Sequence, residues 1–137
     1  MNGKVLIVDG HVNYLFGLER KFIVSGIDVV KCDGTGNIEY VLHLLRQNKI
    51  SFIISELKLP NFHGLEILEK IKSDPDFSQI PYFIYSFVDD EKTKTRAQKL
   101  GANHYFLKDE IGLDEFLMKV QKILSNQNKI KNFKYEN

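Results

Sequence analysis

The feature that most constrains the fold is an alternation of two hydrophobic periods along the 137 residues. Short, uninterrupted apolar runs are typical of strands buried on both faces, and they alternate with segments whose apolar residues recur at helical spacing. The apolar runs predict strands over 5–8, 27–30, 52–54, 82–85 and 105–107, and the periodic segments predict helices that begin near 12, 38, 65, 91 and 113. Strands that alternate with helices predict a parallel sheet with helices on both faces.

Because crossover connections are right-handed, few strand orders suit so short an α/β chain. We expect a three-layer, doubly wound, five-stranded parallel sheet in the flavodoxin-like order 2-1-3-4-5, with another α/β order as the alternative. One domain is predicted over 1–125. Residues 126–137 are rich in Asn and Lys and predict a polar tail or the start of a linker.

Charge and cysteine content exclude several function classes. The chain has 19 Lys+Arg against 18 Asp+Glu, a net charge of +1, which disfavours nucleic-acid binding driven by bulk positive charge. Its single cysteine, Cys32, cannot form a disulfide within the chain, so we expect a cytoplasmic protein. No apolar run approaches the ~20 residues of a membrane-spanning helix, and no membrane partner is expected.

Polar side chains follow the predicted strands where each strand ends. Asp9 follows the first strand, Glu56 the third, Ser86 the fourth and Lys108 the fifth. In an open α/β sheet, ligands bind outside the carboxyl ends of the strands, at the point where the strand order reverses. Two carboxylates, a hydroxyl and an ammonium are therefore expected at one crevice.

Two interpretations of this set stay open from the residues alone. Paired carboxylates can hold Mg²⁺, which prefers oxygen ligands, while a hydroxyl and a lysine can bind phosphoryl oxygens. Alternatively, the carboxylates and the lysine form a structural ion pair that closes the end of the sheet.

Four segments carry a resemblance to a known family: VLIVDG (5–10), IISELKLPNFHGLEIL (53–68), IPYFIYSF (80–87) and GANHYFLK (101–108). Over about residues 4–125 the sequence resembles the receiver domain of two-component response regulators, the CheY-like family. The resemblance places Glu56 at the phosphoacceptor position, Asp9 and Glu56 at the Mg²⁺ site, Ser86 and Lys108 at the phosphate-sensing positions, and Tyr105 at the switch aromatic.

The sequence departs from the family at this site. Gly10 replaces an expected acid, Glu56 replaces the Asp that receivers phosphorylate, and Phe87 replaces a small residue. The resemblance also places four residues around the crevice: Gly10, His11, Lys58 and Phe87. Fewer acids predict weakened Mg²⁺ binding. The longer Glu56 is expected to misplace an attacking oxygen, where ~1 Å can cost ~10²-fold in rate, and to reach Lys108 instead.

We therefore expect a pseudo-receiver that acts by protein–protein interaction without phosphorylation and is not an enzyme. The resemblance implies a protein partner, such as a histidine kinase, an output domain or another signalling protein, on the face formed by 91–100, 105–107 and 113–124. A homodimer is left open, and no nucleic-acid partner is expected. The alternatives are a working receiver that still takes phosphate with help from Mg²⁺, and a small α/β enzyme or ligand-binding domain that uses the same crevice.

Overall fold

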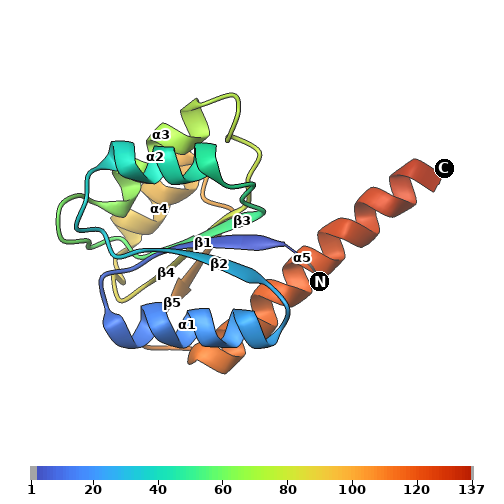
Figure 1. Ribbon diagram of the computed structural model, residues 1–137, viewed down its shortest axis with the longest axis horizontal. Helices are drawn as coiled ribbons and strands as arrows, with labels where there is room; N and C mark the ends of the chain where they lie inside the picture. The colour runs from blue at the N-terminus through green and yellow to red at the C-terminus, as the bar shows by residue number, and fades with distance from the viewer. Residues whose placement is uncertain (1–2, 137) are drawn as a thin grey trace.

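One parallel sheet forms the centre of the molecule. The computed structural model describes the backbone of residues 3–136 and the side chains of residues 3–127. Its strands are β1 (Lys4–Val8), β2 (Asp28–Cys32), β3 (Phe52–Ser55), β4 (Tyr82–Ser86) and β5 (His104–Leu107). They pair in parallel in the order β2-β1-β3-β4-β5, which confirms the predicted topology (Figure 1).

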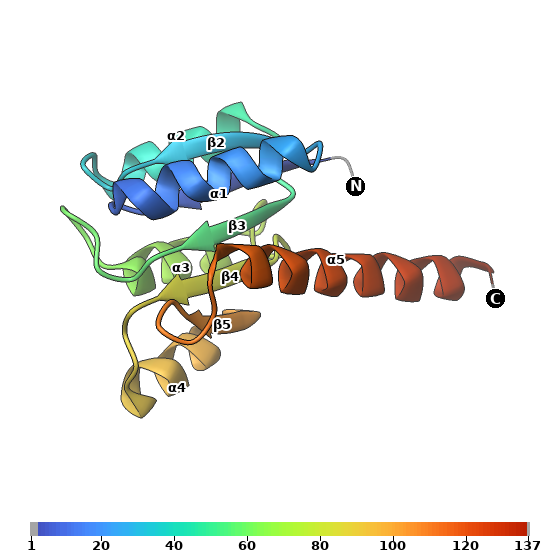
Figure 2. The same ribbon diagram turned by 90° about the horizontal axis from the view of Figure 1, so that it is seen from below.

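Helices cover both faces of the sheet and complete the three layers. Helices α1 (Val12–Val24) and α5 (Leu113–Glu136) lie on one face, and α2 (Ile38–Gln47), α3 (Gly64–Ser73) and α4 (Glu91–Leu100) lie on the other (Figures 1 and 2). No helix among the described residues is long and apolar enough to cross a membrane.

Two hydrophobic clusters fill the spaces between the layers. Successive residues of β1 point to opposite faces, so Leu6 and Val8 pack under α2, α3 and α4, whereas Val5 and Ile7 pack under α1 and α5. All four side chains are fully buried. Burial on both faces explains why the central strands read as continuous apolar runs.

The second strand differs from its predicted bounds of 27–30. Ile27 lies outside β2 because its backbone N–H donates to the carbonyl of Phe22 and closes the end of α1. The strand then continues to Cys32, since β1 offers a pairing partner for each residue from Asp28 to Cys32. Pairing with β1 therefore sets the length of this edge strand.

Helix α5 is longer than the amphipathic pattern of its apolar residues predicted. The apolar spacing ends near Leu124, yet α5 continues to Glu136 and projects beyond the sheet (Figures 1 and 2). The prediction that residues 126–137 form a polar tail or the start of a linker stays a prediction, and residue 137 lies outside the described residues.

Candidate functional site

The carboxyl edge of the sheet gathers four polar side chains. The register pairs Val8 with Ser55, so the next residues, Asp9 and Glu56, follow neighbouring strands. Ser86 ends β4, and Lys108 directly follows β5. Asp9, Glu56, Ser86 and Lys108 are each no more than 5% exposed. The structure therefore brings together the four residues that the sequence placed at the strand ends, and it buries them.

Lys108 binds both carboxylates at once. Its Nζ atom lies 2.7 Å from Asp9 Oδ2 and 2.9 Å from Glu56 Oε2. The Lys108 side chain is completely buried in this position. Charge-assisted hydrogen bonds of this length are strong, and a buried charge requires such partners. The extra methylene of Glu56 thus ends at the lysine, as its length led us to expect.

Backbone N–H groups also donate to the two carboxylates. Asp9 Oδ1 accepts a hydrogen bond from the backbone N–H of His11 at 2.8 Å. Glu56 Oε1 accepts one from the backbone N–H of Leu57 at 2.6 Å, and Glu56 Oε2 accepts a longer one from the N–H of Phe87 at 3.4 Å. Each carboxylate oxygen therefore has at least one donor supplied by the chain itself.

Aromatic rings cover the ammonium. The ring centroids of Tyr14, Phe87 and Tyr85 lie 4.1, 5.1 and 5.9 Å from Lys108 Nζ. Tyr14 and Phe87 meet edge to face at 5.5 Å, and the exposed His11 ring packs edge-on against Phe87. Cation–π contacts of this kind are strongest where water is excluded. Tyr14 and Phe87 therefore act as a lid over the triad formed by Asp9, Glu56 and Lys108.

The triad has a net negative charge. Two carboxylates face a single ammonium, so a buried site holds a formal charge of −1 when both acids are ionised. Burial raises the pKa of Asp9 above its ordinary value, and the hydrogen bond and charge of Lys108 oppose this rise only in part. The closed site therefore favours a proton on Asp9 more than water does.

Ser86 and Tyr105 are both fixed by the loop that follows β4. Ser86 Oγ accepts a hydrogen bond from the N–H of Val88 at 3.0 Å. The Tyr105 hydroxyl donates to the carbonyl of Val88 at 2.7 Å. Burial raises the pKa of Tyr105 to about 12, so the phenol keeps its proton and remains a donor. One residue, Val88, thus connects the site to the aromatic of β5.

The residues fit Mg²⁺ poorly in this arrangement. Mg²⁺ needs free carboxylate oxygens and room for several waters. Here Asp9 and Glu56 point their oxygens at Lys108 and at backbone N–H groups. Among the described residues, no three His, Cys, Asp or Glu side chains are grouped so that they could hold a metal ion.

The residues predicted to line the crevice, Gly10, His11, Lys58 and Phe87, are all exposed. Gly10 is exposed, and a Cβ there would meet Pro60 Cδ at 3.1 Å. Lys58 is exposed and forms an isolated antiparallel bridge with His63. Lys58 is also absent from the ion pairs formed among side chains 3–127.

Sequence reasoning missed two roles. Tyr14, whose ring covers Lys108, lies in the first turn of α1, and the signal for it was an aromatic residue five positions after Asp9, shortly beyond the end of β1. His63 caps α3: its Nδ1 accepts a hydrogen bond from the N–H of Leu65, and Glu66 completes a capping box. The His-x-x-Glu spacing was the available signal.

Comparison with known proteins identifies the family that the sequence matches. Residues 5–121 match the family described as response regulator receiver domain. The chemotaxis protein CheV3 of Helicobacter pylori is 28% identical over 130 residues, which cover 89% of this chain and 41% of CheV3. The response regulator GacA of Pseudomonas aeruginosa is 29% identical over 126 residues, which cover 90% of this chain and 56% of GacA. The chain therefore spans about half the length of these relatives.

Solved structures support the same fold. A CheY-like receiver domain protein of Methanospirillum hungatei superposes with a TM-score of 0.81 at 19% identity, over 94% of this chain and 98% of that one. The receiver domain of Francisella response regulator 1452 gives 0.77 at 23% identity, over 92% and 99%. At these identities the likeness shows the fold alone.

Proposed function

We propose that this chain, which belongs to the response regulator receiver domain family, is a pseudo-receiver whose site is closed by its own ion triad. The observation that carries the proposal is the position of Lys108 Nζ, 2.7 Å from Asp9 and 2.9 Å from Glu56 in a fully buried side chain. In this proposal the chain signals by binding other proteins in the cytoplasm, without phosphorylation or catalysis. Mg²⁺ has at most a weak part in it.

The Glu56 carboxylate supports this proposal because it is unsuited to attack a phosphodonor. Its side chain is 2% exposed, and both of its oxygens already accept hydrogen bonds. A nucleophile must reach its target in line at about 3–3.5 Å, which a buried and bonded oxygen cannot do without rearrangement. The lid of Tyr14 and Phe87 also excludes a phosphodonor from Lys108.

Glu56 also supplies Lys108 with the kind of partner that a phosphoryl group offers, although with fewer oxygens and less charge. In the proposal this contact holds the chain in one state. The fixed Tyr105 hydroxyl, bonded to Val88, supports such a single state at the surface formed by α4, β5 and α5. We propose that this surface binds a protein partner, such as a histidine kinase, an output domain or another signalling protein.

The experiment is an amide NMR titration of the full chain with Mg²⁺ and beryllium fluoride, which mimics a phosphoryl group on a carboxylate. A pseudo-receiver should show no saturable shifts at Glu56, Ser86 and Lys108. Large saturable shifts at these three residues would overturn the proposal and favour a working receiver.

A further inference from the structure

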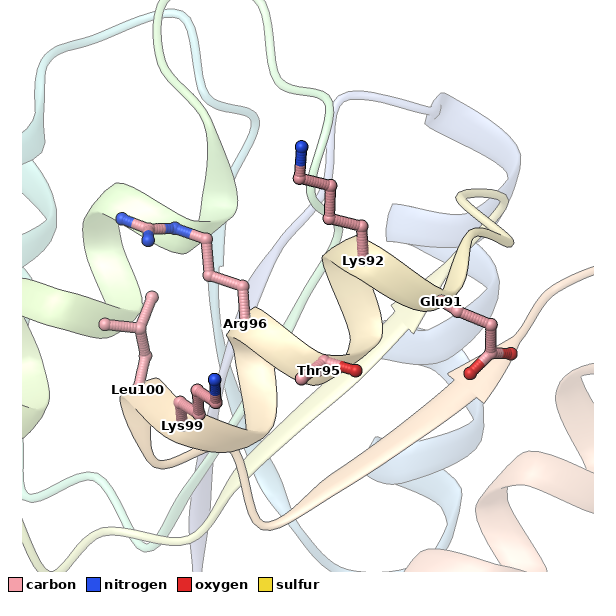
Figure 3. Close-up of a pocket in the computed structure, with 6 residues that line it drawn as sticks. All are labelled: Glu91, Lys92, Thr95, Arg96, Lys99 and Leu100. Carbon is pink, nitrogen blue, oxygen red and sulfur yellow. The ribbon is translucent and has the colours of Figure 1, made fainter.

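Helix α4 presents three cations on one exposed face. Lys92, Arg96 and Lys99 are all exposed, and their spacing of four and three residues places them within an arc of about 60° on a helix with 3.6 residues per turn. Figure 3 shows these side chains spread along α4, with Arg96 between Lys92 and Lys99. Because like charges at these spacings repel, the arrangement is unfavourable for the helix alone.

The three cations line a shallow, open groove of about 440 Å³ whose lining residues all belong to α4. The lining also includes Thr95, with Leu100 at one rim and Glu91 at the other, and Figure 3 shows Glu91 and Leu100 pointing away from each other. The hydrocarbon stems of Lys and Arg add apolar surface beside Leu100. The groove therefore combines a positive centre with an apolar rim.

The described side chains leave these charges largely unpaired. Among side chains 3–127, Lys92, Arg96 and Lys99 form no ion pair. Lys94, by contrast, lies 2.6 Å from Asp89 and 3.6 Å from Glu91. Asp89 and Glu91 thus form their ion pairs with Lys94, while Lys92 interacts with the charge of Asp90 without forming an ion pair and Glu91 also lies at the rim of the groove.

We propose that this α4 groove, in which Lys92, Thr95, Arg96, Lys99 and Leu100 lie beside Glu91 at one rim, is a docking site for an acidic protein segment with an apolar side chain beside its carboxylates. The three cations call for carboxylates on the docked segment, and Leu100 calls for an apolar side chain next to them. A nucleic acid is a poorer occupant, because the chain has a net charge of only +1 and three cations on one helix contact few phosphates.

This site goes beyond the proposed signalling surface. A second groove on α4, formed by Lys94, Gln98 and Tyr105 among others, opens toward β5 and belongs to the surface of α4, β5 and α5. The α4 groove contains none of these three residues. The helix can therefore hold an acidic segment at one side while the other side remains available to a different partner.

The test is an amide NMR titration of the full chain with a synthetic helical peptide that carries Glu at i, i+4 and i+7 and a leucine next to the last Glu. We expect saturable shifts at Lys92, Thr95, Arg96 and Lys99, and weaker binding as salt rises from about 50 to about 300 mM. The triple variant Lys92→Gln, Arg96→Gln, Lys99→Gln should lose about tenfold or more in affinity, since three exposed ion pairs are removed.

A matched variant separates the groove from bulk charge. Arg46→Gln, Lys49→Gln, Lys122→Gln removes the same charge from exposed positions elsewhere and should bind within about twofold of the wild type. Equal weakening in both variants, tighter binding of a peptide of scrambled order, or tighter binding of single-stranded oligothymidine would overturn the proposal. Absence of saturable shifts in α4 would overturn it as well.

Discussion

The ring centroid of Tyr14 lies 4.1 Å from Lys108 Nζ, so the first turn of α1 contacts the residue that follows β5. This contact closes the side of the triad that the two carboxylates leave open. Lys108 therefore has anionic partners on one side and an aromatic face on the other, and no part of its ammonium remains for a ligand.

Removal of the lysine should strongly destabilise the fold. In Lys108→Met the two carboxylates stay buried without a counter-charge, and loss of one partner of a buried ion pair costs about 3–5 kcal/mol. Urea unfolding at neutral pH measures the loss. The control Lys122→Met removes an exposed lysine and should change the free energy of unfolding by less than about 0.5 kcal/mol. A loss below about 1 kcal/mol for Lys108→Met would show that the triad is not closed.

Asp9 should give the stability a distinctive pH dependence. Its pKa is raised above 3.8, chiefly by burial, so just above pH 3.8 the folded chain holds a proton that the unfolded chain has released. Where the folded state binds more protons, stability falls as pH rises. The contribution of Asp9 is thus fully present below pH 3.8 and is lost as pH rises through the raised pKa.

Comparison with Asp9→Asn isolates this contribution, because asparagine does not titrate. The unfolding free energy of the wild type minus that of the variant should decrease from about pH 4 to neutral pH. Denaturant titrations at a series of pH values measure the difference. An increase over this range would mean that Lys108, rather than burial, controls the Asp9 carboxyl.

Gly64 should not tolerate a side chain. A Cβ at this first residue of α3 would collide with the carbonyl oxygen of Glu56 and would lie 2.9 Å from Leu57 Cα. Gly64→Ala should therefore cost about 1–3 kcal/mol through overpacking and shift the amide signals of Glu56 and Leu57. Gly112→Ala is the control, because a Cβ there meets nothing within 4 Å. Equal effects of the two changes would refute the close approach of α3 to the end of β3.

The fold was predictable from the sequence because a central strand that is buried on both faces consists of consecutive apolar residues. β2 was the exception: it is an edge strand with exposed and partly exposed residues, and only its pairing with β1 fixes its end at Cys32. The extension of α5 to Glu136 was also missed, because its last turns lack the apolar spacing of the first ones.

The site was predictable only in part. Strand ends identified Asp9, Glu56, Ser86 and Lys108, since the topology carries those positions to one edge. Tyr14 was missed, because an aromatic residue shortly after the first strand does not by itself show that α1 will carry its ring over Lys108. Phe87 was noted as a bulky departure from the family, but its ring contact with Lys108 required the structure.

Restoration of the family acids should restore metal binding. In Gly10→Asp with Glu56→Asp, the shorter acid withdraws from Lys108 and a second carboxylate joins Asp9, which increases the charge and the number of ligands. The new Cβ at position 10 requires only a small shift, since Pro60 Cδ at 3.1 Å and the Asp33 carbonyl at 3.3 Å are its nearest contacts. Calorimetric titration should detect Mg²⁺ binding in the double variant and much weaker binding in the wild type. Equal Mg²⁺ affinity in the two proteins would contradict the account.

The most direct test of the central claim is the intact mass of the full chain after incubation with acetyl phosphate and Mg²⁺. The closed triad predicts that the mass stays unchanged, while the double variant with both acids restored gains a phosphoryl group. A phosphoryl adduct on the wild type that disappears in Glu56→Gln would contradict the account, because it would show that the Glu56 carboxylate is free to react.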